Sequence, residues 1–256
     1  LVRLSYGRVQ TPTLQMIVER HNQLINFKKS FTYKLQAHKS EKTIFTTDEY
    51  ESKDMVEQLQ QRINQRELEV VDRKVERKKT NPPKLFDLTL LQRTCNQKFS
   101  FTAKKTLDLA QSLYEKKLIT YPRTDSNFIN QTMKQEAFDL ASRFLESSMF
   151  DGVDFIPNYE LSINDAKVTD HHAIIPTKNA LTNNTVSEDE QKVLDCIINR
   201  FIASGCSERR YEVCKVTAQV DGIDFTATTT KEYDAGWTAI EKQQKKENDE
   251  YNEELF

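Results

Sequence analysis

The sequence lacks three features that would point to a class of protein: a long apolar run, paired cysteines and an excess of basic charge. No stretch of its 256 residues approaches the roughly 18 apolar residues that span a bilayer, which predicts no contact with a membrane. The four cysteines (Cys95, Cys196, Cys206 and Cys214) show no CxxC pair and no metal-ligand spacing, so we expect reduced thiols. With 37 basic against 39 acidic side chains, any contact with nucleic acid must be local.

The N-terminus shows neither an initiator methionine nor a signal peptide. The chain begins at Leu1, and we expect it to be part of a longer protein. Its length exceeds the roughly 100 to 200 residues of a usual domain, which predicts one large domain or two modest ones.

Apolar spacing in the first 80 residues predicts a helix followed by β structure. Thr11 and Pro12 favour a helix start, and from Phe31 the apolar period changes from helical to two. The patterns predict, in chain order, a helix over 14–25, a β hairpin over 31–37 and 43–47, a polar helix over 53–64, and a strand over 68–75 that ends in the basic run 73–79.

A second β signal lies far downstream. Residues 216–220 and 223–227 alternate on either side of Asp221-Gly222, and Asp-Gly between alternating strands is the strongest short hairpin signal. The two β stretches enclose a helical segment of about 85–180. The predicted fold class is therefore α+β, with a split β-rich domain interrupted by a helical one.

Three helices of this part of the chain have their own start signals. An apolar stripe ending at Leu113 and Tyr114 follows a Thr102 cap. A capping box over 132–135 opens a helix that uses Phe138, Ala141 and Leu145, and a second box over 187–190 precedes an apolar helix up to Phe201.

The segment from Leu118 to Ser126 carries the chemistry. Pro122 biases Tyr121 toward extended backbone, and residues two apart in an extended chain share a face. Tyr121 and Arg123 are therefore predicted to face the same ligand. A free tyrosine has a pKa of about 10, and a neighbouring guanidinium favours phenolate and can clamp a phosphodiester. Taken alone, Tyr-Pro-Arg is usually a turn with a surface arginine.

The longer context resembles one family, the type IA DNA topoisomerases. Residues 119–126 read ITYPRTDS, which resembles the family's active-site motif in its topoisomerase III form. Residues 5–14 are similar to the GRVQTPTL signature, with Tyr6 at a place where a small or aliphatic residue is expected. Residues 170–177 resemble the HHAIIPT segment, and Gly236-Trp237 the late GW, so four motifs occur in order over about 230 residues.

The resemblance implies a role for each matching residue. Tyr121 would attack one DNA strand to give a 5′-phosphotyrosine link, Arg123 would hold the scissile phosphate, and His171 would lie near that phosphate. The residues implied in contacts with single-stranded DNA are Arg8, Gln10, Asp125 and His172. Strand passage and resealing would need no ATP, because the covalent link keeps a phosphodiester-like bond.

The resemblance also implies an organisation into domains. We expect a leading helix from the DNA-binding arch at 1–27, a split β-rich hinge domain at 28–80 and 188–245, a helical domain with the catalytic tyrosine at 81–187, and a charged tail at 246–256. Magnesium would be held by a Toprim domain outside this chain, with no cofactor or metal in the chain itself. The fragment alone would be inactive, and the parent a monomer in the cytoplasm, associated with the nucleoid.

Other interpretations of the same residues remain open. Residues 85–98 and 103–116 could form a helix-turn-helix in a DNA-binding module without enzymatic activity. A tyrosine recombinase would also form phosphotyrosine, but its arginine and histidine cluster is expected before the tyrosine. His171 and His172 face opposite ways in an extended strand, which disfavours joint metal ligation. The basic run 73–79 is more typical of a solvated face than of a DNA contact.

Overall fold

The computed structural model describes residues 7–40, 43–150, 155–182 and 185–242. The chain forms two compact units. Unit 1 is Leu1–Asp72 with Val216–Ala227, and unit 2 is Arg73–Lys215 with Thr228–Phe256. The expected charged tail at 246–256 lies outside the described residues. Among the described helices, none combines the length and the apolar character needed to cross a bilayer.

Unit 1 begins with the predicted helix, α1, Gln10–Ile25. The Thr11 hydroxyl accepts a hydrogen bond from the Gly7 N–H at 3.2 Å, and Pro12 falls in the first turn, where a missing N–H costs nothing. None of the residues of α1 is buried.

The predicted hairpin and the helix behind it are confirmed, although the strands are shorter than expected. Strands β1, Gln36–His38, and β2, Ile44–Thr46, pair antiparallel, and an isolated bridge joins Tyr33 to Tyr50. Helix α2, Lys53–Ile63, starts behind Ser52, whose side chain accepts the Met55 N–H.

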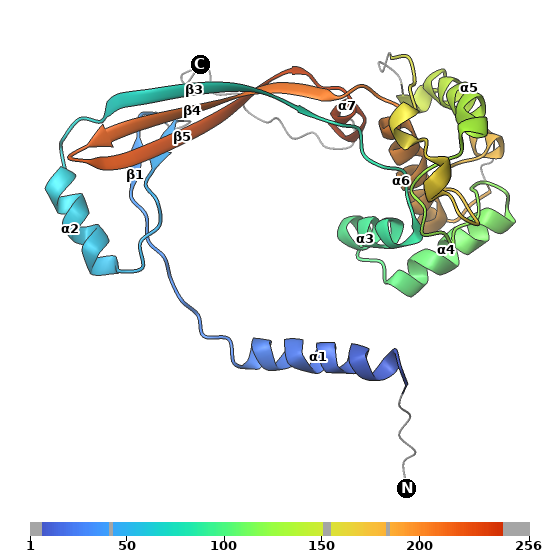
Figure 1. Ribbon diagram of the computed structural model, residues 1–256, viewed down its shortest axis with the longest axis horizontal. Helices are drawn as coiled ribbons and strands as arrows, with labels where there is room; N and C mark the ends of the chain where they lie inside the picture. Colours follow the sequence, from blue (N-terminus) through green and yellow to red (C-terminus); the bar gives the residue numbers. More distant parts are fainter. Residues whose placement is uncertain (1–6, 41–42, 151–154, 183–184, 243–256) are drawn as a thin grey trace, which may run out of the picture. The chain divides into compact units, whose positions relative to one another are not determined.

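Three long strands complete a five-stranded sheet of order β1-β2-β5-β4-β3 (Figure 1). They are β3, Glu69–Thr80, β4, Arg209–Val220, and β5, Ile223–Asp234. Asp221 and Gly222 form the predicted turn, with φ of 53° and 77°, as a type I′ hairpin turn requires. Arg62 in the last turn of α2 and Arg66 shortly after the helix bind the Asp221 carboxylate at 2.7 and 3.3 Å, which joins this end of the helix to the turn.

Strand β3 is longer than the sequence predicted, because it continues through the basic run to Thr80. It lies at the edge of the sheet and is exposed along almost all of its length. Arg77 pairs with Glu212 at 2.9 Å and Lys79 with Glu208 at 3.0 Å, both acceptors lying at or near β4. Part of the basic run is therefore neutralised within unit 2.

The helices of unit 2 surround one apolar core. They are α3, Leu88–Phe99, α4, Ala103–Glu115, α5, Lys134–Leu145, α6, Glu188–Ser204, and α7, Thr238–Lys242, with short 3-10 turns at Gln131–Met133, Ser148–Phe150, Glu160–Ser162, Asp165–Lys167 and Lys178–Leu181. Figure 1 shows α3, α4, α5 and α6 grouped together. The four cysteines are buried and none forms a disulfide. Helix α6 joins this core, whereas the sequence placed residues from 188 onward with the β-rich domain.

The predicted start of α5 is wrong. A 3-10 turn, Gln131–Met133, occupies the residues that the capping box would use, and the N-cap of α5 is Met133 without a side-chain hydrogen bond. The Gln131 N–H instead donates to the Asp165 carboxylate at 2.7 Å, a partner 34 residues away. The buried face of α5 is correspondingly shifted from the expected one to Ala137, Leu140, Ala141 and Phe144.

The Gly236-Trp237 pair ties two strand ends together. Gly236 has a φ of +48°, and a Cβ there would lie 2.5 Å from the carbonyl oxygen of Glu208, so only glycine fits. The Trp237 backbone N–H donates to the Ser207 carbonyl at 3.1 Å, and its indole N–H to the Thr80 carbonyl at 3.2 Å. The pair therefore connects the end of β3 with the chain just before β4.

The predicted capping box of α6 is confirmed and carries a buried charge. The Ser187 N–H donates to the Glu190 carboxylate at 2.7 Å, and the Glu190 N–H to the Ser187 hydroxyl at 3.3 Å. Lys116 and Ser112 of the α4 region also donate to this carboxylate, at 2.7 and 2.6 Å. The Lys116 hydrogen bond above all lowers the pKa of Glu190 to about 2.

We predict that Glu190→Ala lowers the free energy of unfolding of this chain by about 2 kcal/mol at pH 7, because a helix cap and a charged contact are lost together. The pKa of Glu190 is below its ordinary value of 4.5, so its contribution is complete above that pH and disappears as the pH falls toward 2. Urea unfolding of both proteins between pH 7 and pH 2 measures the difference.

Glu188→Ala is the matched control. Glu188 lies in the same helical turn but is 85% exposed, and its contact with Lys192 spans only one turn of α6. Its loss should cost no more than about 0.5 kcal/mol. Equal losses in the two variants, or a difference that persists at pH 2, would contradict the assignment.

Candidate active site

The tyrosine segment begins where α4 ends. Lys117 adopts the left-handed conformation, with a φ of 59°. Its N–H donates to the Tyr114 carbonyl at 2.8 Å, and the Leu118 N–H reaches back to the Leu113 carbonyl at 2.9 Å. These two bonds form a Schellman motif, and Leu113 and Leu118 are both fully buried, as the hydrophobic contact of that motif requires.

Beyond this turn the chain is irregular, and burial alternates with a period of two over residues 121–126. Pro122, Thr124 and Ser126 are buried, whereas Tyr121 is half-buried and Arg123 is exposed. Asp125 is exposed as well. The alternation turns Tyr121 and Arg123 away from the core of unit 2, which is the arrangement that the spacing predicted.

The segment docks on the HHAIIPT segment, residues 171–177, which lies some 50 residues downstream, and an isolated β-bridge joins Ile119 to Pro176. The Thr120 N–H donates to the Ile175 carbonyl at 3.0 Å. Its hydroxyl donates to the Ala173 carbonyl at 3.1 Å and accepts from the Ile175 N–H at 3.0 Å. The Thr124 hydroxyl donates to the His171 carbonyl at 3.0 Å. Hydrogen bonds on both sides of Tyr121 thus hold its backbone to the HHAIIPT segment.

Further bonds hold the far end of the segment. The Leu88 N–H, at the start of α3, donates to the Thr124 carbonyl at 3.0 Å. The Ser126 hydroxyl accepts from the Phe128 N–H at 3.2 Å and donates to the Lys167 carbonyl at 2.8 Å. The Ser126 side chain therefore satisfies backbone groups on both sides, as short polar side chains commonly do.

The Tyr121 ring lies against two other rings. The His171 imidazole is 4.4 Å away between ring centroids, tilted by 46°. The Tyr114 ring, from the last turn of α4, is 5.4 Å away and nearly perpendicular, at 76°. An edge-to-face pair at this separation is an attractive arrangement of two aromatic rings. Of the predicted site residues, the structure thus brings Tyr121 and His171 into contact.

Arg123 and Asp125 keep their charged groups available. Within the part of the chain that the structure describes, neither side chain makes a hydrogen bond or an ion pair. An exposed guanidinium two residues from a tyrosine can bind a phosphate by two parallel hydrogen bonds.

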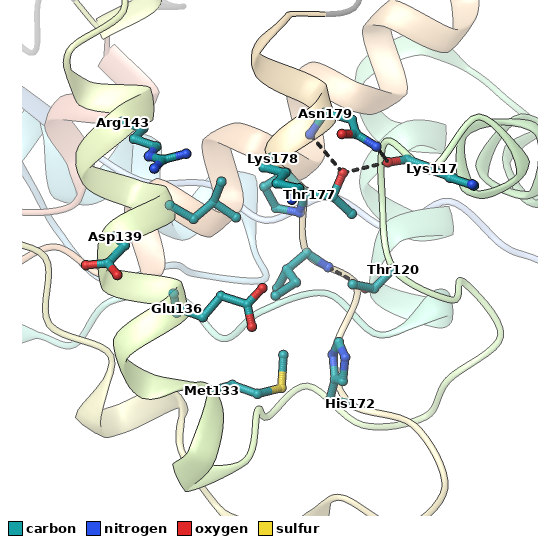
Figure 2. A pocket seen from close by; sticks show the side chains of 14 residues that line it. Lys117, Thr120, Met133, Glu136, Asp139, Arg143, His172, Thr177, Lys178 and Asn179 are labelled. Atoms are coloured by element: carbon teal, nitrogen blue, oxygen red, sulfur yellow. Dashed lines mark hydrogen bonds between the residues drawn. The ribbon is translucent and has the colours of Figure 1, made fainter.

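His172 faces a different region from His171, as expected for neighbours in an extended strand. Its Nδ1 lies 2.8 Å from the Ala173 carbonyl. The ring lines a cavity of about 640 Å³, and Figure 2 shows Glu136 and Arg143 of α5 on one side of it and His172 with Thr120 on the other. Thr120 therefore forms part of the cavity wall while its hydroxyl holds the tyrosine segment.

Arg8 and Gln10 belong to unit 1, at the start of α1, and both are exposed. Tyr121, Arg123, Asp125, His171 and His172 all belong to unit 2. The structure thus groups five of the seven predicted site residues in one unit.

Sequence reasoning missed the contacts of Tyr114, Thr120 and Thr124. Tyr114 was assigned to the apolar stripe of its helix, yet 39% of it is exposed. The alternation of Thr120, Pro122 and Thr124 was a usable signal, because small polar residues on the inner face of an irregular segment commonly bond to backbone.

The helices of the alternative DNA-binding module are used inside unit 2. Helix α4 packs on α6, Lys105 pairs with Asp189 at 2.7 Å, and Lys116 pairs with Glu190 at 2.7 Å. These two lysines, which a DNA-binding module would present to DNA, therefore have partners inside unit 2.

Comparison with known proteins identifies the family. A family model described as DNA topoisomerase matches residues 2–255. The chain is 37% identical to DNA topoisomerase 3 of Bacillus licheniformis and 36% identical to that of Bacillus subtilis, over 93% of this chain and 34% of each relative. The chain thus spans about a third of the length of these relatives.

A solved structure shows the same fold. Full-length topoisomerase I from Thermotoga maritima matches with a TM-score of 0.74 and 26% identity, over 98% of this chain and 42% of that protein. These matches favour the topoisomerase interpretation over the helix-turn-helix module. Because the family match runs through nearly the whole chain and includes the tyrosine segment, this chain belongs to the DNA topoisomerase family, as a topoisomerase III-like region of the type IA class.

Proposed function

We propose that this chain supplies the nucleophile with which its parent protein cleaves and reseals one DNA strand. The observation that carries the proposal is the position of Tyr121, which faces away from the core in a segment that is hydrogen-bonded to the HHAIIPT segment and lies against His171. Arg123, two residues away, makes no ion pair within the described residues. A scaffold that holds the backbone of a nucleophile while leaving its side chain accessible suits covalent catalysis.

The chemical step is a transesterification. The Tyr121 hydroxyl oxygen attacks the phosphorus of a phosphodiester and forms a 5′-phosphotyrosine bond. The bond from phosphorus to the 3′ oxygen breaks, the phenol loses its proton, and the 3′ oxygen leaves as a hydroxyl. Attack by that hydroxyl reverses each change, so passage of another strand through the gap requires no ATP.

Arg123 binds the scissile phosphate in this mechanism. Charge grows on the phosphoryl oxygens as the phosphorus is attacked, and a guanidinium already in place stabilises it without reorganisation. His171, in ring contact with Tyr121, lies near the same phosphate. Arg8, Gln10, Asp125 and His172 contact single-stranded DNA.

The parent supplies what this chain does not. Across the described residues, no group of three or more His, Cys, Asp or Glu side chains could hold a metal ion. We assign Mg²⁺, which would offset phosphate charge, to the Toprim domain that the family resemblance implies. For the parent we propose a hinge domain at 28–80 and 188–245 and a tyrosine domain at 81–187, with α6, at the start of the second hinge segment, packed on the core of the tyrosine domain.

The parent works as a monomer in the bacterial cytoplasm, at the nucleoid. Support for the location comes from the bacterial relatives, and support for the DNA substrate from the family.

Removal of the Tyr121 hydroxyl tests the nucleophile. In the parent protein, Tyr121→Phe should keep DNA binding and stability while abolishing the covalent protein–DNA adduct, because only the attacking oxygen is lost. A denaturing gel of labelled oligonucleotide measures the adduct, and Tyr233→Phe, at a 54% exposed position, is the control. A covalent band that persists in Tyr121→Phe would overturn the proposal.

Substitution of Arg123 separates cleavage from binding. Arg123→Ala in the parent should lower the cleavage rate by about 100-fold while DNA affinity falls less than about fivefold, since the guanidinium acts mainly on the transition state. Arg123→Lys should recover only part of the rate, because an ammonium lacks the planar fork. Equal losses in rate and affinity would instead indicate a general phosphate contact.

The isolated chain should bind but not cut. With magnesium and a single-stranded oligonucleotide we expect weak, salt-sensitive binding through local basic residues, without cleavage and without relaxation of supercoiled DNA. Joining the chain to the rest of its parent should restore cleavage through Tyr121. Cleavage and covalent trapping by the chain alone would show that its own residues suffice.

A further inference from the structure

The side chain of Tyr121 is restricted by neighbours from two different elements. The His171 imidazole, from the HHAIIPT segment, lies 4.4 Å from the Tyr121 ring between centroids. The Tyr114 ring, from α4, lies 5.4 Å from it. His171 has a place in the family resemblance already, whereas Tyr114 has none. The edge-to-face contact with Tyr114 therefore needs an account of its own.

The backbone of Tyr121 leaves little freedom, so the side-chain torsions decide where the hydroxyl points. Thr120 and Thr124, which lie on either side of Tyr121, form hydrogen bonds with residues 171–175. Pro122 restricts the backbone of the residue before it, which is Tyr121. A tyrosine side chain in this position can still rotate about χ1 among staggered positions. A ring packed against Tyr121 limits that rotation.

The end of α4 places Tyr114 for this contact. Lys117 takes a left-handed conformation that is unfavourable for a residue other than glycine. The Schellman bonds from Lys117 to Tyr114 and from Leu118 to Leu113 then turn the chain sharply. The chain turns back so that Tyr121 packs beside the last turn of the helix that precedes it.

We propose that Tyr114 is a positioning residue for the nucleophile: its ring holds the Tyr121 ring in the rotamer that presents the hydroxyl to the phosphate. The inference rests on the proposed function. Its energetic basis is that a group held in a near-attack orientation avoids the ordering that a freely rotating group must undergo in each turnover.

The exposure of Tyr114 makes the idea testable without loss of the fold. The residue is 39% exposed at the end of α4, so a substitution there leaves the core of unit 2 intact. Leucine and phenylalanine both suit a helix, and phenylalanine alone keeps an aromatic edge. Tyr114→Phe removes only the hydroxyl and keeps the ring, whereas Tyr114→Leu removes the ring and keeps an apolar side chain. Comparison of the two variants therefore separates the effect of the ring contact from the effects of the hydroxyl and of side-chain volume.

The experiment uses the full parent protein and single-turnover cleavage of a labelled single-stranded oligonucleotide. Tyr114→Leu should lower the rates of cleavage and of religation together by about tenfold, because both directions share one transition state. The cleavage equilibrium, the oligonucleotide Kd and the melting temperature should stay near those of the parent. Tyr114→Phe should restore both rates to within about twofold, since the edge-to-face contact remains.

Tyr233→Leu is the control for loss of an exposed tyrosine ring elsewhere in unit 2. Unchanged rates in Tyr114→Leu would overturn the proposal, as would an equal loss in Tyr114→Phe, which would show a role of the hydroxyl. A rise in Kd that accounts for the lost rate would make Tyr114 a DNA contact instead. The Tyr121 adduct distinguishes the two claims: if it still forms while Tyr114→Leu is unimpaired, only the positioning role fails.

Discussion

The hydrogen bonds between Thr120 and Thr124 and the HHAIIPT segment, at residues 171–175, are the constraint on which the site depends. The tyrosine segment is neither helix nor part of the five-stranded sheet, so its buried backbone groups need partners from elsewhere in unit 2. The HHAIIPT segment provides these partners, and the same hydrogen bonds bring His171 into contact with Tyr121. Nucleophile and histidine therefore take their positions from one set of bonds.

The same constraint explains which side chains remain available. Thr120 and Thr124 face the HHAIIPT segment, and the alternation of burial along residues 121–126 leaves Tyr121, Arg123 and Asp125 on the more exposed side. Within the described residues, Arg123 makes no ion pair that would have to break before its guanidinium binds a phosphate. The basic side chains at the end of β3 and in α4 differ, because several of them already pair with carboxylates of unit 2.

Local sequence signals predicted local structure well, but they did not predict contacts between residues that are distant in sequence. The box at Ser187 and the Asp221-Gly222 turn depend on neighbouring residues, and both were read correctly. The start of α5 was wrong because Asp165, 34 residues away, satisfies the backbone there. The Tyr114 contact depends on a left-handed lysine that no composition rule indicates. The family motifs identified Tyr121, but the residues that contact its side chain could be identified only from the structure.

The most direct test of this account is to identify the residue that becomes linked to DNA. The parent protein would be incubated with magnesium and a single-stranded oligonucleotide, trapped by denaturant, digested with protease, and analysed by mass spectrometry for a nucleotide-bearing peptide. The account predicts one modified residue, Tyr121, joined to a 5′ phosphate. A nucleotide on Tyr114, on any other side chain, or on Tyr121 through a 3′ phosphate would contradict it.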